Sequence, residues 1–457
     1  MKIIAPLAAF FAAAAGLSVM AASAGAQTLD FPVQYHKLSN GLRVVLSPDS
    51  TAPIVTVAVY YRIGFRIEPK NRTGFAHLFE HMMFQGSKNL GKMEFIRLIE
   101  NNGGVLNGST RFDFTNYFEI VPAHVLETTL WAEADRMRGL DLTQENLTNQ
   151  QGVVTNEVKG SVLNQPYGGF PWLDLPQAAN KNWYNAHNFY GDLKDLAAAT
   201  LADVQSFFKT FYAPNNAVLV VTGDFEPASA LALVKKHFEN IPAAILPFPP
   251  DLTEPRQEKE IRVERVDPLA QKPALAFGYH MPDRGTPEYF AMGLIDQILL
   301  QGEDSRLYRT LVQEKGITSG VSGGINGDLG NMFDYNGPML WSASLVHDAG
   351  TTPEAILRLI DEQIEQLRTK PVEKSVLDRA LIKMRSGFYD QLGGFFGFGR
   401  ANLLASYALF DDHPEKVNVL ENEFKKVTPT LILRTAQEIL RPANRTIVVL
   451  KTKTPGR

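Results

Sequence analysis

Short apolar stretches near the start of the chain have the pattern of β-strands. The sequence YHKLSNGLRVVLSPDSTAPIVTVAVYYRIGFR, residues 35–66, is rich in β-branched residues and contains the turn signal Asn40-Gly41. This pattern predicts a hairpin followed by a further strand over residues 54–61. The later apolar run AVLVVTG, residues 217–223, predicts another strand.

Two other segments carry helix signals. Residues 74–85 are mostly apolar, and Gly86 stands where a left-handed cap would end a buried helix. In TLADVQSFFKTFY, Thr200 and Asp203 have the spacing of a capping box, so a helix is expected to begin there.

A proline-rich segment divides the chain. Five prolines lie within PAAILPFPPDLTEP, residues 242–255, and this density predicts a semi-rigid linker. The sequence on either side is similar in two places. FAHLFEHMMFQG resembles MGLIDQILLQG, which begins at Met292, and PNNAVLVV resembles PANRTIVV, which begins at Pro442. Two pairs in the same order indicate duplication of a unit of roughly 200 residues, with chance similarity as the alternative.

These patterns predict four consecutive parts. They are a leader at 1–26, a first domain at 28–241, a proline-rich linker with a lead-in at 242–267, and a second domain at 268–457.

The composition narrows the class of protein. Of the 457 residues, 45% are hydrophobic and 21% are charged, which is typical of folded domains with sizeable cores. The net charge is -4 and there is no long basic block, so nucleic-acid binding is not expected. Cysteine is absent, so any metal must be held by histidine and carboxylate side chains.

The N-terminus has the pattern of an export signal. Lys2 is followed by an uncharged apolar run and by small residues that end in Ala24-Gly25-Ala26. This order predicts a signal peptide cleaved after Ala26. The alternative is an uncleaved membrane anchor, since the run is long enough to span a bilayer. We find no other stretch that is long and apolar enough, so no membrane span is expected after cleavage.

Three ionisable residues interrupt the apolar segment GFAHLFEHMMFQG. On a helix, His77 and His81 lie one turn apart on the same face, and Glu80 lies beside them. Two imidazoles at this spacing can bind one Zn²⁺, with the carboxylate placed as a general base for a water molecule. A catalytic zinc ion typically takes three protein ligands. A third ligand must therefore come from elsewhere in the chain.

The alternative is that these residues fall at this spacing by chance, an event of about one per cent for a chain of this length. The second copy argues against a purely structural role. There Gly293 stands in place of His77, Asp296 in place of Glu80 and Gln297 in place of His81. The ionisable residues are therefore dispensable for forming the helix.

The chain resembles the pitrilysin-type M16 zinc peptidases, and within them the smaller class that includes the mitochondrial processing peptidase. The segments that carry the resemblance span nearly the whole mature chain, and only the H-x-x-E-H segment with a downstream Glu is diagnostic. They are LSNGLRVVL, GFAHLFEHMMFQGS, GGVLNGSTRFDFTNYF, VVTNEVKGSVLNQPYG, FYAPNNAVLVVTGDF and the weaker repeat after the linker. The resemblance implies an α+β fold of two homologous domains, each a mostly antiparallel sheet with packed helices, which form half of a clamshell.

The resemblance also implies the roles of the site residues. His77 and His81 would be metal ligands and Glu80 the general base. Glu157 matches the third ligand, and one Zn²⁺ per chain is expected. The family usually has a second Glu two turns earlier, where this chain has Gln150, which can form a hydrogen bond but brings no charge.

The segment GGVLNGSTRFDFTNYFEI is similar to the substrate-binding edge strand of the family. Its backbone would pair with an extended peptide at Asn107, Gly108 and Ser109. The family usually has Asn-Ala where this chain has Asn107-Gly108. The alternative is an ordinary hairpin with no role in binding.

One part of the family pattern is missing. Active members position the substrate with an Arg and a Tyr, and the matching run VQEKGITS has Val312 and Ser319 at those positions. The chain thus resembles the catalytic subunit of a heterodimer, in which a homologous M16 partner would supply the pair.

We therefore expect a zinc-dependent endopeptidase that acts on peptides or unfolded segments in a closed chamber, in the periplasm of a Gram-negative bacterium. One rival is a non-catalytic scaffold subunit. The other is a peptide-binding or chaperone module that does not cleave.

Overall fold

The computed structural model describes residues 30–327, 329–394 and 398–453. The predicted signal peptide lies outside the described residues. Within these ranges, no helix combines the length and the apolar character that crossing a bilayer requires.

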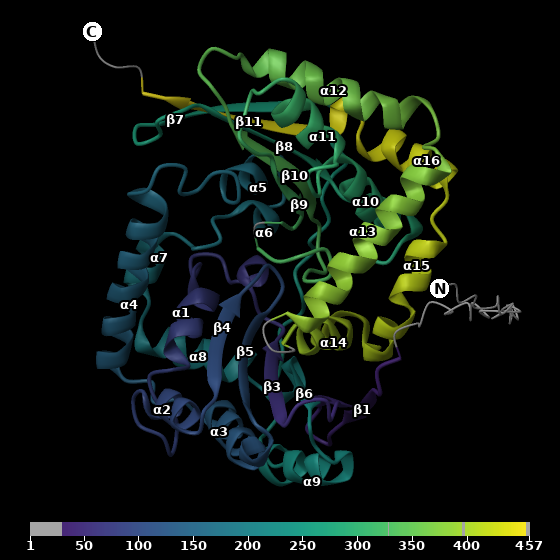
Figure 1. The fold of residues 1–457 in the computed structure, drawn as a ribbon. Helices are drawn as coiled ribbons and strands as arrows, with labels where there is room; N and C mark the ends of the chain where they lie inside the picture. Colours follow the sequence, from purple (N-terminus) through teal and green to yellow (C-terminus); the bar gives the residue numbers. More distant parts are fainter. Residues whose placement is uncertain (1–29, 328, 395–397, 454–457) are drawn as a thin grey trace, which may run out of the picture.

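A six-stranded sheet forms the centre of the first half (Figure 1). Its order is β1-β2-β6-β3-β5-β4, with β2 and β6 parallel and the other neighbours antiparallel. The strands are β1 (Gln34–Lys37), β2 (Arg43–Pro48), β3 (Ile54–Tyr61), β4 (Val105–Thr110), β5 (Thr115–Pro122) and β6 (Ala217–Gly223).

A five-stranded sheet forms the centre of the second half. Its order is β7-β11-β8-β10-β9, again with one parallel pair, β7 and β11. Apart from the extra strand β1, the two halves thus share one strand order, which supports the predicted duplication and confirms the predicted α+β class. The strands are β7 (Ile261–Asp267), β8 (Ala274–His280), β9 (Ser322–Ile325), β10 (Leu340–Val346) and β11 (Arg445–Thr452).

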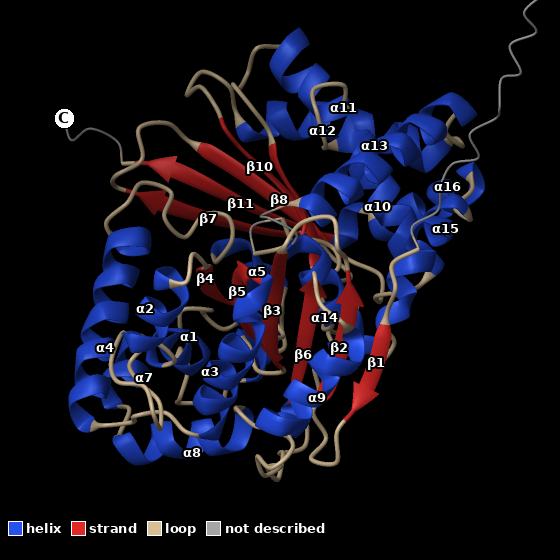
Figure 2. Ribbon diagram, turned by 60° about the horizontal axis from the view of Figure 1, so that its bottom comes forward, coloured by secondary structure: helices blue, strands red, loops and turns tan. Residues whose placement is uncertain are grey.

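Helices pack against both sheets (Figure 2). Those of the first half are α1 (Phe75–Met82), α2 (Glu94–Asn101), α3 (Leu126–Arg138), α4 (Gln144–Val158), α5 (Asp174–Ala179), α6 (Trp183–Ala186), α7 (Leu193–Ala198), α8 (Leu201–Phe211) and α9 (Pro227–Phe238). Those of the second half are α10 (Pro287–Leu299), α11 (Arg306–Tyr308), α12 (Pro353–Thr369), α13 (Lys374–Gly393), α14 (Phe398–Asp411), α15 (Leu420–Lys425) and α16 (Pro429–Ile439).

Several predicted local features are present. Gly41 has a φ of 86° in the turn between β1 and β2, a conformation that glycine adopts without steric cost. The expected strand over residues 54–61 is β3, with the same bounds. Thr200 and Asp203 form a complete capping box at the start of α8.

Each half contributes a helix to the other half. Helix α14 packs on β2, β3 and β6 of the first sheet, and α5 packs on β7, β8 and β11 of the second (Figures 1 and 2). Polar contacts accompany the packing, as Tyr60 Oη donates to Asn402 Oδ1 at 2.7 Å. Because each sheet completes its core with a helix from the other half, the halves do not pack as independent units.

The proline-rich segment connects the two sheets. Residues 242–260 form no helix or strand. The strand β7 follows at once and pairs with the last strand, β11. The domain boundaries themselves stay a prediction.

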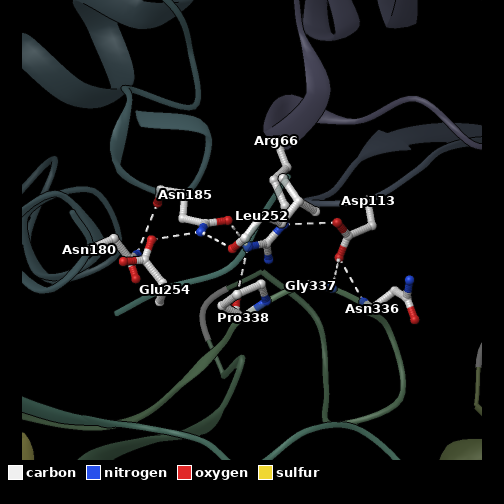
Figure 3. A network of polar contacts seen from close by, with 9 residues as sticks. All are labelled: Arg66, Asp113, Asn180, Asn185, Leu252, Glu254, Asn336, Gly337 and Pro338. Carbon is white, nitrogen blue, oxygen red and sulfur yellow. Dashed lines mark hydrogen bonds and ion pairs between the residues drawn. The ribbon is translucent and has the colours of Figure 1, made fainter. Parts of the chain in front are cut away.

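A buried network around Arg66 joins the two halves and the linker (Figure 3). Arg66 is 1% exposed. It donates to Asp113 Oδ1 at 2.8 Å and to the carbonyl oxygen of Pro338 at 2.8 Å. It also donates to Asn185, whose amide donates to Glu254 in the linker at 2.6 Å. The first half, the second half and the linker are therefore held at one point.

Candidate metal centre

The helix α1 carries the His-Glu-His segment, and its apolar residues hold it in the core. Phe75, Leu78, Phe79 and Met82 are at most 1% exposed. The helix is one turn shorter than predicted, because the chain after Met82 continues in a tighter turn towards Gly86, whose φ of 124° is positive as expected.

The N-terminus of α1 is held by a buried carboxylate. Glu68 accepts hydrogen bonds from Gly74 N at 2.8 Å and Ala76 N at 2.6 Å. Burial raises the pKa of Glu68, although His187 and these two amides oppose the rise. Backbone amides at a helix N-terminus favour an acceptor of this kind. Glu68 thereby fixes the start of the helix, directly before His77.

Three potential ligand atoms converge at the surface of α1. His77 Nε2 and His81 Nε2 lie 3.3 Å apart. The Glu157 carboxylate lies 3.5 Å from His77 Nε2 and 3.2 Å from His81 Nε2. Tetrahedral ligands at a Zn–N distance of 2.0–2.1 Å lie about 3.3 Å from one another. The separations and the donor types therefore fit a zinc ion.

Glu157 reaches this cluster from a different helix, α4, which packs against α1. The hydrogen bonds to His77 and His81 hold its pKa well below the ordinary value, so the carboxylate is charged. The chain leaves α4 in a π-helical turn at Lys159–Leu163, directly after the ligand candidate. Such turns occur often at functional sites.

The Glu80 side chain lies beside the cluster and contacts the edge strand β4. Its Oε2 accepts a 2.7 Å hydrogen bond from Thr110 Oγ1. A Cβ atom added at Gly108 would lie 3.3 Å from Glu80 Cγ. The small residue at this point of β4 thus lets the strand pass close to the carboxylate.

The three predicted substrate-binding residues lie on β4, at the end of the sheet order. Asn107 is exposed and Gly108 is buried against Glu80. The amide of Gly108 donates to Asn107 Oδ1 at 2.8 Å instead of to β5, and Ser109 Oγ donates to Asn116 Oδ1. The backbone of Gly108 therefore faces the open edge, although peptide binding there stays a prediction.

The remaining predicted positions lie away from the cluster. Gln150 is buried on α4 and its amide donates to Asn149 Oδ1 at 2.8 Å. Among the described contacts, none joins Gln150 to the three ligand candidates. Val312 is partly buried in a π-helical turn of the second half, and Ser319 is exposed in the loop before β9.

The second half retains the geometry of the site without its metal ligands. Asp296 on α10 lies opposite Gly324 of the edge strand β9, with a Cβ added at Gly324 3.7 Å from its carboxylate. In the first half, Glu80 on α1 likewise lies close to the edge strand β4, against Gly108. This supports the predicted pairing of Glu80 with Asp296.

Tyr190 also belongs to the site, although the sequence patterns did not single it out. Its ring lies edge-on to His77, with 4.9 Å between ring centroids, and its hydroxyl donates to Glu157 Oε1 at 3.5 Å. Burial and the nearby Glu157 raise the pKa of Tyr190 to about 12, so the hydroxyl keeps its proton at neutral pH.

Glu68, Thr110 and Tyr190 share one reason for having been missed. Thr110 and Tyr190 act through contacts with residues far away in the sequence, and Glu68 acts through a loop contact six to eight residues long, so no helix or strand periodicity indicates any of them. The signal that could have found Thr110 is its place in the edge strand next to Gly108.

The chain matches two family models. Residues 43–166 match the model described as insulinase, peptidase family M16, and residues 198–384 match the one described as the peptidase M16 inactive domain. The zinc protease PqqE of Helicobacter pylori is 28% identical over 91% of this chain and 91% of its own length. Mitochondrial-processing peptidase subunit beta of Bos taurus is 28% identical over 44% of this chain and 40% of its own length.

Solved structures share the fold. A protease from Helicobacter pylori has a TM-score of 0.84 at 26% identity, over 92% of this chain and 100% of that one. The periplasmic protease PqqL from Escherichia coli has a TM-score of 0.74 at 19% identity, over 93% of this chain and 48% of that one.

The fold has two halves of one topology, and the first half carries a His-Glu-His helix that faces an edge strand. These features place the fold in the class of the M16-like peptidases. The chain belongs to the M16 peptidase family, and its relative PqqE of Helicobacter pylori is a zinc protease by name.

Proposed function

We propose that this chain is a zinc-dependent endopeptidase that acts as the catalytic subunit of a heterodimer. The observation that carries the proposal is the convergence of His77, His81 and Glu157 at tetrahedral ligand separations, with Glu80 on the same helix as the two histidines. A bound Zn²⁺ would polarise the scissile carbonyl and lower the pKa of a water molecule.

Residues of the chain would carry out the proton transfer and orient the general base. Glu80 accepts a proton from the attacking water and delivers it to the leaving amine, while the water oxygen bonds to the carbonyl carbon and the C–N bond breaks. Thr110 holds one oxygen of Glu80, which orients the other towards the water. Only one carboxylate is needed, because it returns to its charged state after each turnover.

The edge strand β4 is the proposed binding site for the backbone of the substrate. A peptide strand that adds to the open edge at Asn107, Gly108 and Ser109 passes within reach of Glu80, because Gly108 lies against that side chain. Backbone pairing of this kind requires an extended peptide, so peptides and unfolded segments are the expected substrates. They would be bound in the closed chamber that the resemblance implies.

The absent Arg and Tyr support a requirement for a partner. Val312 and Ser319 cannot form the charged and phenolic contacts that the resemblance assigns to these positions. A homologous M16 subunit would supply the pair across the chamber. The same observation favours the second candidate, a peptide-binding subunit without turnover, which would leave peptide masses unchanged after long incubation with zinc and partner.

The predicted signal peptide supports a periplasmic location. The relative PqqL of Escherichia coli is itself described as periplasmic. Recovery of the chain in the periplasmic fraction, with an N-terminus at residue 27, tests this part of the proposal. A full-length chain in the cytoplasmic fraction would contradict it.

The experiment that tests the function is an assay with internally quenched peptides. It compares the chain alone with the chain mixed with a homologous subunit from the same organism, each with and without a chelator. Cleavage that is chelator-sensitive and much faster in the mixture is expected. Equal rates with and without the partner would contradict the heterodimer, and no cleavage in any mixture would contradict the peptidase.

A further inference from the structure

A phenol from outside the His-Glu-His helix is built into the metal centre. Tyr190 lies in the loop between α6 and α7, with its ring edge-on to His77 and its hydroxyl 3.5 Å from Glu157 Oε1. Trp172 also contacts this ring edge-on, with 5.3 Å between ring centroids. The Tyr190 ring therefore contacts both a metal-ligand candidate and a second aromatic residue.

The backbone fixes this position. Gly191, directly after Tyr190, packs against Gly74 at the start of α1, and a Cβ added at Gly191 would lie 2.3 Å from Gly74 N. Equally, a Cβ at Gly74 would lie 2.6 Å from the carbonyl oxygen of Tyr190. Both glycines have a positive φ, of 75° and 83°. Gly74 and Gly191, which lie against each other in space, thus let the loop touch the helix one turn before His77.

Hydrogen bonds hold the same contact. Asp192 N donates to Thr73 Oγ1 at 2.9 Å, and Thr73 Oγ1 donates to Asp195 Oδ2 at 2.7 Å. The loop after Tyr190 is therefore joined to the segment before α1 at several points. The backbone that carries Tyr190 is therefore fixed relative to the helix that carries His77 and His81.

The hydroxyl of Tyr190 is only weakly engaged. A distance of 3.5 Å to Glu157 Oε1 is at the limit of a hydrogen bond, whereas O–H···O bonds are usually 2.5–3.0 Å long. A donor held beside the ligand cluster, and not committed to a strong partner, is available to a substrate oxygen at the same cluster.

We propose that Tyr190 is a catalytic residue, whose hydroxyl donates a hydrogen bond to the scissile carbonyl oxygen as negative charge develops on it. The inference rests on the proposed peptidase function and deepens it. Tyr190 keeps its own proton throughout, while Glu80 carries the proton from the water to the leaving amine. The chain thus supplies one phenolic donor itself, although Ser319 stands where the resemblance leads us to expect a tyrosine.

The test is the variant Tyr190→Phe, which removes the hydroxyl and keeps the ring. The matched control is Tyr184→Phe, six residues earlier, where the half-buried ring packs on Trp183. Both are measured as the full zinc-loaded chain with its homologous partner. We expect Tyr190→Phe to lower kcat on the order of 10²-fold, as for other lost oxyanion donors, with KM and zinc content little changed.

A second measurement separates catalysis from a structural role. A phosphinic peptide imitates the tetrahedral state, so its affinity is expected to fall in parallel with kcat, while the affinity of the substrate peptide in a Glu80→Gln background stays the same. Loss of zinc in Tyr190→Phe would overturn the proposal, because Tyr190 would then position Glu157. A kcat equal to that of the Tyr184→Phe control would also overturn it. If the unmodified complex cleaves no peptide, the proposed function fails first and the inference fails with it.

Discussion

The hydroxyl of Thr110 donates a 2.7 Å hydrogen bond to Glu80, and this bond joins the edge strand β4 to the helix α1. The strand that would hold the peptide and the carboxylate that would activate the water are therefore positioned by one contact.

This contact predicts the effect of two substitutions at residue 110. A general base contributes about 10²–10⁴-fold to the rate, so the partial loss of its orientation in Thr110→Val is expected to lower kcat by roughly tenfold. Thr110→Ser keeps the hydroxyl and is expected to stay close to the natural chain. The measurement is kcat for both variants at equal zinc content, and equal values for the two would rule out this role.

The ligand set predicts the effect of losing Glu157. Glu157→Ala leaves two imidazoles, so the zinc content of the purified chain is expected to fall far below about one ion per chain. The fold is expected to persist, because the second half forms the equivalent helix without ligands. Metal analysis and circular dichroism check this. Glu145→Ala, at an exposed position of the same helix, is the control, and equal zinc in both variants would contradict the assignment.

The buried Asp296 predicts a pH dependence of stability. Burial raises its pKa from the ordinary 3.8 to about 6, against the opposing hydrogen bonds from Trp341 and Gln301. The folded chain therefore binds more protons than the unfolded chain between about pH 4 and 6, and the contribution of Asp296 to stability falls as the pH rises through this window.

Asp296→Asn removes the charge and keeps an acceptor for Trp341 Nε1. At pH 7 the free energy of unfolding of this variant is expected to exceed that of the natural chain by up to about 3 kcal/mol, and the gain is expected to vanish near pH 4. Urea unfolding at the two pH values measures it. The exposed Asp390→Asn is the control, and a gain of the same size at both pH values would refute the explanation.

The Arg66 network predicts that replacing Arg66 lowers the stability of the fold. Arg66→Met leaves the buried Asp113 without its ion-pair partner, which is expected to cost about 3 kcal/mol in the free energy of unfolding. Lys374→Met breaks the exposed pair with Asp378 and is expected to cost at most about 0.5 kcal/mol. Urea unfolding midpoints compare the two, and similar small losses would show that the network does not join the halves.

The sequence predicted the local elements and the duplicated sheets, because strand periodicity, turn residues and capping residues act over a few positions. The bounds of β3 and the capping box at Thr200 follow directly from such patterns. The spacing of His77 and His81 likewise predicts their shared face. Glu157, however, lies on another helix, so only the resemblance singled it out.

Contacts between distant segments could not be predicted in this way. The crossing of α5 and α14 to the opposite sheets depends on how two similar cores are completed, which no local pattern in either helix indicates. The contact of Gly74 with Gly191 is equally invisible, since neither glycine belongs to a local motif that names its partner.

The most direct test of the central claim is the zinc content and the peptide turnover of Glu80→Gln, in complex with the homologous subunit. The exposed Glu100→Gln is the matched control. Because Glu80 stands beside the ligands and is not one of them, the variant is expected to hold as much zinc as the control and to cleave no quenched peptide. Turnover at the control's rate in zinc-loaded Glu80→Gln would contradict the account.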